Sequence, residues 1–498
     1  MPHMTLADER LRELDNPSLT ENERVVLRCR VAADLIHRGQ YEAAREALGE
    51  LWPGVGQRPE VKKLPPVTAA EVLLQCGTLT GWLGSARNVS GAQEQAQDLL
   101  SEALRKFKSQ GKGAKVSEAQ YELAMCYWRL GSYDESRVTL EEALKGLGEH
   151  DGELKAKVLI RRTLVEVWTG RCHEAWKVLE EAATFFDGCG DALKGMWHGQ
   201  RGLVLRRLAT AEGRSDYADR AIIEFTAAIY HYEQARHERY CATNLNNLAM
   251  LLYKLGRYKE AHEHLDRAEF IFSRLKDPGN LAQVDETRAR VFAAEKRYGE
   301  ADRIIAGVIK TFEKGGEYAL LADALTVQGV IWASLGASER SIATLQRAAD
   351  IAEGVGALTI AGLAALALIE EHGAGRLLTQ SEVYKAYMRA DRLLTDTQDA
   401  EAVTRLRACA RVVMRRLAGV QLRDKNFSLY SAVQEFEAKI IEQALEETGG
   451  SVTHAAKLLG LKHQTLGSIL NQRHKRLLDK RRPPVPRRKS IVKDRPKG

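Results

Sequence analysis

"NLNNLAMLLYKLGRYKEAHEHLDRAE", residues 244–269, carries apolar residues every three or four positions on both sides of one Leu-Gly pair. This spacing places the apolar residues on one face of a helix, before and after the glycine. Glycine ends helices because it readily takes the left-handed backbone conformation. "YELAMCYWRLGSYDESRVTLEEAL", residues 121–144, has the same pattern, L-A-x(5)-L-G-x-Y-x-x-[AS]. The two stretches predict helical hairpins built from one repeated unit.

Further copies of this unit extend over most of the chain. The third copy contains Gly329, Trp332 and Gly336, and a weaker one contains Phe292 and Tyr298. A small residue in the second helix of each hairpin, where the two backbones approach, recurs at intervals of 39–52 residues. About eight hairpins and an all-α fold are therefore predicted. The small residues are Ala44, Ala96, Ser136, Ala175, Ala221, Ala261, Ala301 and Ser341.

The pattern resembles the tetratricopeptide repeat (TPR) family. Intervals of about 40 residues also suit HEAT or armadillo repeats, but the G-x-Y-x-x-A turn favours TPR. The resemblance implies an α-solenoid whose concave face, lined by the first helix of each hairpin, binds a peptide or a protein segment. Asn246, Asn247 and Arg290 occupy positions that often contact such a partner in the family, although each also suits a solvated polar face.

Proline positions outline the domains. Between Val67 and Arg482 the only proline is Pro278, whereas "WPGVGQRPEVKKLPP" precedes this range. We therefore expect an N-terminal helical segment with the first hairpin and a proline-rich linker at 1–66, and the TPR-like solenoid at 67–420. A helix-turn-helix at 428–478 and a disordered basic tail at 479–498 are expected to follow.

The stretch "TGGSVTHAAKLLGLKHQTLGSIL", residues 448–470, differs from the repeats. An amphipathic helix at about 431–447 precedes it, with Val433, Phe436, Ile440, Ile441 and Leu445 predicted on one side. Two short helices, at about 452–459 and from about 463, flank a turn at Gly460 with Leu461 tucked in. Three helices with a glycine at the tight turn predict a helix-turn-helix, whose recognition helix enters the DNA major groove.

This segment resembles the Fis-type helix-turn-helix, found in the nucleoid protein Fis and in NtrC-like activators. The pattern of that family, AA-x-x-LG followed by T-L, is met by Ala455 and Ala456, Leu459 and Gly460, and Thr465 and Leu466. The resemblance implies binding to double-stranded DNA as a homodimer. The chain departs from the family at 467–469, where Gly-Ser-Ile replaces mostly basic or aromatic residues.

Positive charge is concentrated beyond the recognition helix. Residues 471–498 contain twelve Lys or Arg and two Asp, a charge of +10, so the residues before them carry −3 of the total of +7. Such a segment attracts polyanions such as nucleic acid. The candidate DNA-contacting residues are Thr453, His454, Lys462, His463, Gln464, Thr465, Ser468, Arg473, Lys475, Arg476, Lys480, Arg481 and Arg482.

The sequence carries no recognisable enzyme signature. "SQGKGAK" at 109–115 lacks the phosphate-loop spacing, and "AHEHL" places His262 and His264 on different helix faces. The seven cysteines are scattered singly, which favours a reducing cytoplasm over disulfides or a zinc site. No signal peptide or membrane span is expected, and neither a metal nor a cofactor.

The prediction is thus a cytoplasmic, non-enzymatic transcriptional regulator. A TPR array senses a protein or peptide partner, and a C-terminal Fis-type module binds specific DNA. The alternatives are a TPR adaptor or scaffold with only nonspecific affinity for nucleic acid, a peptide-pheromone receptor, and a phage-defence or stress sensor.

Overall fold

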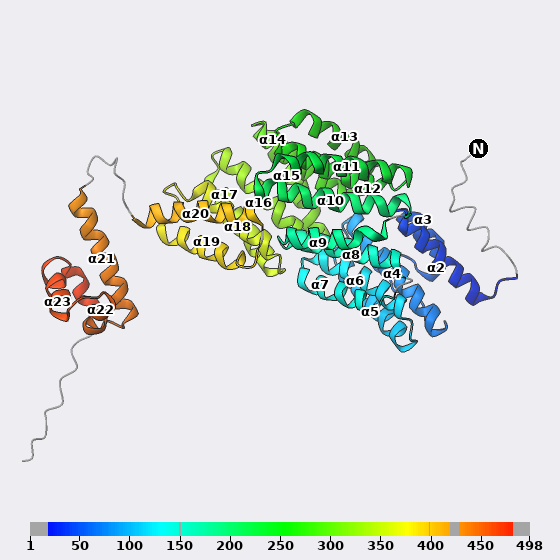
Figure 1. The fold of residues 1–498 in the computed structure, drawn as a ribbon, viewed down its shortest axis with the longest axis horizontal. Coiled ribbons are helices and arrows are strands. Elements are labelled where there is room, and N and C mark those ends of the chain that lie inside the picture. Colours follow the sequence, from blue (N-terminus) through cyan, green and yellow to red (C-terminus); the bar gives the residue numbers. More distant parts are fainter. Residues whose placement is uncertain (1–17, 149–150, 187, 398, 419–427, 482–498) are drawn as a thin grey trace, which may run out of the picture. The chain divides into compact units, whose positions relative to one another are not determined.

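The computed structural model describes residues 18–148, 151–186, 188–397, 399–418 and 428–481. The chain divides into two compact units, Met1–Val412 and Val413–Gly498 (Figure 1). Every regular element among the described residues is helical. The predicted all-α class is confirmed.

The first unit is a series of antiparallel helical pairs, each packed on the next. All eight predicted pairs are present in the described part of the chain, and 358–393 adds a ninth. Two 3₁₀ turns, η2 (Gly49–Leu51) and η3 (Ala183–Phe185), extend α3 and α9, and α20 (Ala400–Ala418) follows the last pair. The pairs are α2 (Glu21–His37) with α3 (Tyr41–Leu48), α4 (Pro66–Arg87) with α5 (Ala92–Ser109), α6 (Gly113–Leu130) with α7 (Tyr133–Lys145), α8 (Gly152–Trp168) with α9 (Cys172–Ala182), α10 (Asp191–Glu212) with α11 (Ser215–Gln234), α12 (Glu238–Lys254) with α13 (Tyr258–Arg274), α14 (Pro278–Ala294) with α15 (Tyr298–Gly315), α16 (Tyr318–Ser334) with α17 (Ser338–Gly354), and α18 (Leu358–His372) with α19 (Gln380–Leu393).

The small residues of the repeat lie where the two helices of a pair meet. All eight second-helix positions, from Ala44 to Ser341, are fully buried. The hydroxyl of Ser341 donates to the carbonyl of Gly329 at 2.6 Å. A Cβ at Gly329 would lie 2.6 Å from Cγ of Leu345, too close for any side chain there. The helices of this pair therefore approach closely only because both contact positions are small.

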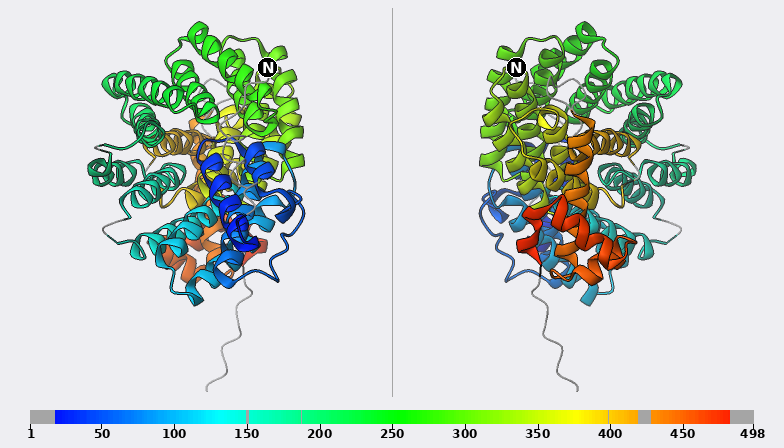
Figure 2. Two further views of the ribbon diagram at one scale, coloured as in Figure 1. Left: turned by 90° about the vertical axis from the view of Figure 1, so that its right-hand side faces the viewer. Right: turned by 90° about the vertical axis from the view of Figure 1, so that its left-hand side faces the viewer.

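The solenoid curves so that hairpins far apart in sequence touch. Figure 2 shows the pairs of this unit following one another around a central axis. The turn before α3 meets the start of α12, where Nε of Arg239 donates to the carbonyl of Gly39 at 3.0 Å. Farther along, the hydroxyl of Ser85 at the end of α4 contacts the Glu317 carboxylate before α16. Each of these two contacts joins hairpins that are more than 190 residues apart in the sequence.

His237 sits at this join and is buried in its neutral form. Its ring stacks on Tyr240 at 4.1 Å, and its Nδ1 accepts the backbone N–H of Tyr240 at 3.3 Å. The pKa of His237 is lowered to about 4, mainly by burial and to a smaller extent by the positive charge of Arg239. Protonation would remove the acceptor and place a charge where only 2% of the side chain is exposed.

Acidification is therefore expected to weaken the first unit through His237. Between about pH 6.5 and 4 the unfolded chain binds a proton that the folded chain excludes, so the free energy of unfolding falls as pH falls. The loss is at most about 2 kcal/mol at pH 5. Urea unfolding of the full chain at pH 7.5 and 5.0 measures it, and His237→Gln should reduce the difference. Equal pH dependence in both proteins would contradict this assignment.

The second unit contains α21 (Leu429–Glu447), α22 (Val452–Leu458), α23 (His463–Gln472) and the 3₁₀ turn η4 (Lys475–Lys480). Its core joins all four elements, and Gly450 and Gly460 make the turns at φ +81° and +67°. The three-helix prediction holds. The core residues are Ala438, Ile441, Ala444, Leu445, Ala455, Ala456, Leu466, Leu470 and Leu477.

The inner face predicted for α21 needs correction. Ile441 and Leu445 are buried, but Val433, Phe436 and Ile440 are 57%, 55% and 39% exposed. The α22–α23 pair is too short to cover both the first and the second half of α21. Leu461, expected to tuck into the turn, is also exposed.

Several domain boundaries fall outside the described residues. The predicted end of the solenoid at 420 lies within 419–427, and the tail beyond Arg481 lies outside as well. The first helix of the predicted solenoid, α4, begins at Pro66, and 52–65 contains no helix. In the described part of the chain no helix is both long and apolar enough to cross a bilayer.

Candidate nucleic-acid interface and partner groove

The turn between α22 and α23 fixes the position of the recognition helix. Ser451 caps α22 by accepting the backbone N–H of His454 at 3.5 Å, and its hydroxyl lies 2.9 Å from Nδ1 of that histidine. The N–H of Leu461 donates to the carbonyl of Ala456 at 2.8 Å across Gly460. Because Ala455 and Ala456 are almost fully buried, α22 packs closely on its neighbours. The family-type residues thus act as scaffold.

One face of α23 is polar and accessible. Leu466 and Leu470 are fully buried, while Gln464, Thr465 and Ser468 are exposed. Lys462 and His463 at the start of the helix, and Thr453 and His454 on α22, are exposed too. No side chain caps the first turn of α23, so its N–H groups remain available to a phosphate. This face can approach a DNA groove without disturbing the core.

The basic residues after α23 fall into two groups. Arg473 lies 3.3 Å from the Glu437 carboxylate, and Lys480 lies 2.5 Å and 2.6 Å from Glu442 and Glu446. Lys475 and Arg476 are exposed and form no ion pair with any residue that the structure describes. Two of the predicted DNA contacts therefore hold other parts of the unit against α21, Arg473 at the end of α23 and Lys480 on η4.

The remaining predicted basic contacts differ in their surroundings. Arg481 is half-buried, and its Nε donates to the carbonyl of Leu478 at 3.4 Å. Arg482 lies outside the described residues. His474 was not among the predicted site residues. It is only 5% exposed, and its ring lies 2.9 Å from the Glu437 carboxylate. A histidine between basic residues resembles part of the charged run, so nothing in the pattern separates it from its neighbours.

Charge is separated within the second unit. Five glutamates lie on α21, whereas the stretch from Thr448 to Gln472 contains no carboxylate and two lysines. Three of the glutamates pair with basic residues after α23. The exposed face of α23 with Gln464, Thr465 and Ser468, called the reading face below, carries no charged side chain apart from Lys462 at its start. Basic residues that could face a phosphate backbone are then Lys457 and Lys462, Lys475 and Arg476, and those that the sequence contains beyond Arg481.

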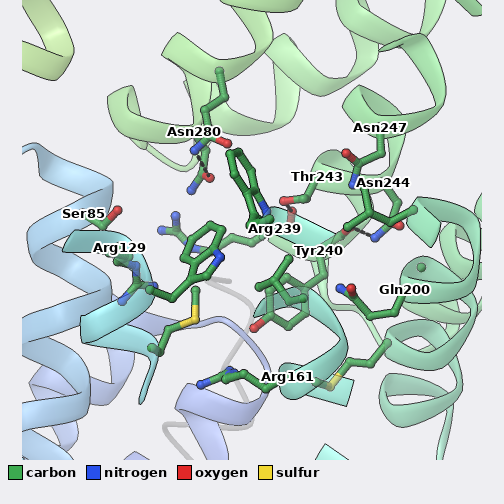
Figure 3. A pocket seen from close by; sticks show the side chains of 18 of the residues that line it. Ser85, Arg129, Arg161, Gln200, Arg239, Tyr240, Thr243, Asn244, Asn247 and Asn280 are labelled. Atoms are coloured by element: carbon green, nitrogen blue, oxygen red, sulfur yellow. Dashed lines mark hydrogen bonds between the residues drawn. The ribbon is translucent and has the colours of Figure 1, made fainter. Parts of the chain in front are cut away.

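The three residues predicted to line the partner groove lie on the first helices of their pairs, but they differ in whether they face the cavity and in their bonding partners. Asn247 on α12 lines a cavity of about 250 Å³ inside the first unit (Figure 3). Asn246 does not line it, and its buried Oδ1 has no partner within the described part of the chain. Arg290 contacts the carboxylate of Glu286 and lies 2.9 Å from that of Asp323. Only Asn247 of the three therefore faces this cavity.

The cavity is lined mainly by the first helices of the pairs, as the repeat predicts. Helices α4, α6, α8, α10, α12, α14 and α16 all contribute side chains. Figure 3 shows Arg129, Arg161 and Gln200 around it, with Tyr240, Thr243 and Asn244 presented by α12. Gly199 on α10 leaves room for Asn244, since a Cβ there would lie 2.7 Å from its Oδ1.

Comparison with known families assigns both parts. The model described as "Bacterial regulatory protein, Fis family" matches residues 432–468, and tetratricopeptide repeat models match 93–151 and 241–268. No curated protein matched the sequence.

One solved structure has a TM-score above 0.5 and supports the fold of the array. A Rap protein complexed with competence and sporulation factor is 15% identical over 79% of this chain and 99% of its own, with a TM-score of 0.51. A STAND protein with a tetratricopeptide repeat sensor from Pyrococcus horikoshii is 12% identical over 82% of this chain and 57% of its own, with a TM-score of 0.43. The chain therefore combines tetratricopeptide repeats with a C-terminal helix-turn-helix of the Fis type.

Proposed function

We propose that this protein is a sequence-specific DNA-binding transcriptional regulator that acts by binding rather than by catalysis. The observation that carries the proposal is the exposed polar face of α23 in the segment that matches the Fis family. Gln464 can pair with adenine through its amide, and Ser468 can bond to either partner of a base pair. Thr453 and His454 on α22 would contact phosphate.

In this proposal the TPR array senses a protein or peptide partner. Concave solenoid surfaces bind extended segments, and Asn247 offers an amide toward the interior. Binding of the partner would change how the DNA-binding modules are placed, and so their occupancy of an operator. Asn246 and Arg290 remain part of this prediction, although Arg290 would have to exchange its carboxylate partners.

Footprinting of genomic DNA with the full chain, and with a chain lacking 428–498, tests the proposal. Discrete protected sites are expected only with the full chain. In the variant with Gln464→Ala and Ser468→Ala, sequence preference should be lost while nonspecific binding remains. If the full chain protects no discrete sites, the proposal is wrong and an adaptor with nonspecific affinity accounts for the basic segment.

Arg476 and Lys480 are expected to differ in their effect on DNA affinity. Arg476→Gln should lower the slope of log affinity against log salt by about 1, because one phosphate contact is lost. Lys480→Gln should change the slope less, since Lys480 already pairs with Glu442 and Glu446. Binding measured from low to moderate salt checks both. Equal effects would mean that DNA displaces the carboxylates of α21.

We also propose that the module dimerises through the exposed apolar residues of α21. Tyr430, Val433, Phe436 and Ile440 recur every three or four positions and are 39–72% exposed. Burying such a stripe against a second copy removes apolar surface from water and aligns two recognition helices with two half-sites. Such a contact would cover the part of α21 that the core of its own module leaves exposed.

Phe436→Asp is expected to convert the dimer to a monomer, because it places a charge in the apolar contact. Analytical ultracentrifugation of the full chain measures the change. Lys439→Gln is the matched control, since it alters the charge by the same amount on an exposed position outside the stripe. A monomeric wild-type chain, or a dimer unaffected by Phe436→Asp, would contradict the proposed contact.

A further inference from the structure

The cavity inside the first unit has strongly aromatic walls. Trp82, Trp128 and Trp168 line it together with Tyr41 and Tyr240. Trp128 and Trp168 pack edge to face with their ring centroids 5.5 Å apart. Nε1 of Trp128 is buried and has no hydrogen-bond partner among the described residues. Such walls suit a flat apolar body that can also accept a hydrogen bond.

Five arginines line the same cavity, but only two of them have carboxylate partners. Arg239 contacts Asp277, and Arg161 lies 3.7 Å from Glu122. Arg129, Arg206 and Arg207 form no ion pair with any described residue. Arg129 instead lies over the Trp82 ring, 4.1 Å from its centroid.

The lining offers little negative charge in return. Glu317 is its one carboxylate, and burial raises the pKa of that group while Ser85 hydrogen-bonds to it. The lining itself therefore has an excess of positive charge, which Glu286 and Glu401, two carboxylates outside the lining, only partly offset at Arg206.

Arg206 and Arg207 are adjacent on α10 and poorly compensated. Burial, followed by the charges of Arg207 and Arg290, lowers the pKa of Arg206 to about 9, so it remains charged at neutral pH. The one described hydrogen bond of its guanidinium group is a long contact of 3.4 Å to the carbonyl of Asn247. Nε of Arg207 is buried without a partner in the described part of the chain. Leaving a buried polar group without a partner is unfavourable, and an anion placed here would supply partners for both arginines.

We propose that this cavity binds a compact organic anion, an aromatic acid whose ring lies between the tryptophans and tyrosines and whose acid group pairs with Arg206 and Arg207. This goes beyond the proposed function, which directs a protein or peptide partner to the side of the array that Asn247 lines but assigns no small organic acid to it. A volume of about 250 Å³ leaves room for a molecule of this kind, since by the same measure about 10–15 Å³ is enough to hold one water molecule. Bidentate pairing with guanidinium groups favours a planar carboxylate or a similar oxyanion.

The test uses the full chain and two fluorescent probes that share one ring system. Anilinonaphthalene sulfonate carries the acid group, and phenylnaphthylamine lacks it. The sulfonate is expected to bind tighter than the amine. Arg206→Met and Arg207→Met should each weaken the sulfonate about tenfold or more and leave the amine unchanged, since a hydrogen bond to a charged group contributes about 1.5–3 kcal/mol.

Matched controls separate binding from folding. Arg214→Met removes the same charge from an exposed site outside the cavity and should leave both probes unchanged. Thr243→Trp fills the cavity without changing its charge and should exclude both probes. Circular dichroism and thermal unfolding verify that each variant is folded.

Competition identifies the source of the acid group. Phenylpropionate should displace the sulfonate, whereas a tetrapeptide ending in phenylalanine should not. Displacement by the peptide alone would overturn the proposal in favour of a chain terminus. Equal binding of the two probes, or sulfonate binding that folded arginine variants leave unchanged, would also overturn it. None of these readouts involves DNA, so failure here is distinguishable from failure of the proposed function.

Discussion

Leu466→Ala is expected to unfold α21–η4 and to abolish every discrete DNA footprint of the full chain. Leu466 on α23 is fully buried in the core that α23 shares with α21 and α22, and truncating such a residue costs about 2–5 kcal/mol. A core of this size rarely supplies more than about 3–5 kcal/mol in total. Hydrogen exchange of residues 428–481 in the full chain measures the loss, and the first unit should keep its protection.

Thr465→Ala is the control for this change, because Thr465 is exposed at the neighbouring position on α23. Its amide protection should match that of the wild type, and only affinity or preference for DNA should change. If Leu466→Ala retains both protection and footprints, Leu466 is not the anchor of this core. If Leu466→Ala unfolds the module but footprints persist, DNA is read elsewhere in the chain.

The helical hairpins could be predicted from the sequence because each one packs mainly within itself and on its neighbours in the chain. Each hairpin needs a small residue in the second helix, a turn such as Gly256 and apolar residues at helical spacing, and all of these recur at a near-constant interval. The contact of Gly39 with Arg239 was not readable. This contact forms because several successive hairpins together curve the solenoid back on itself, and the sequence of one repeat does not specify that curvature.

The candidate site was only partly readable for a different reason. Burial of Ala455, Ala456 and Leu466 follows from the family pattern, which is a packing pattern. Which basic residues are free depends on side chains across the fold. Glu437, Glu442 and Glu446 lie more than 30 residues before Arg473 and Lys480, so their pairing appears only in three dimensions. The arginines facing the cavity come from four helices and share no local motif.

Because the reading face carries little charge, the electrostatic attraction to DNA must come from other parts of the chain. Between Thr448 and Gln472 the only charged residues are Lys457 and Lys462, and α21 engages Arg473 and Lys480. Nonspecific DNA affinity comes almost entirely from neutralised phosphates. Within this proposal, the Lys and Arg residues beyond Arg481 must supply most of that affinity, whereas base preference resides on α23.

Removal of residues 482–498 is therefore expected to reduce DNA affinity about 100-fold or more at moderate salt and to leave base preference intact. The segment contains seven Lys or Arg and one Asp. Each lost phosphate contact lowers the salt slope by about 0.9, so a decrease of about 3–6 is expected. A full-length variant with these seven residues replaced by glutamine separates charge from length and should behave like the truncation. An unchanged slope in both proteins would place the phosphate contacts on Lys457, Lys462, Lys475 and Arg476 instead.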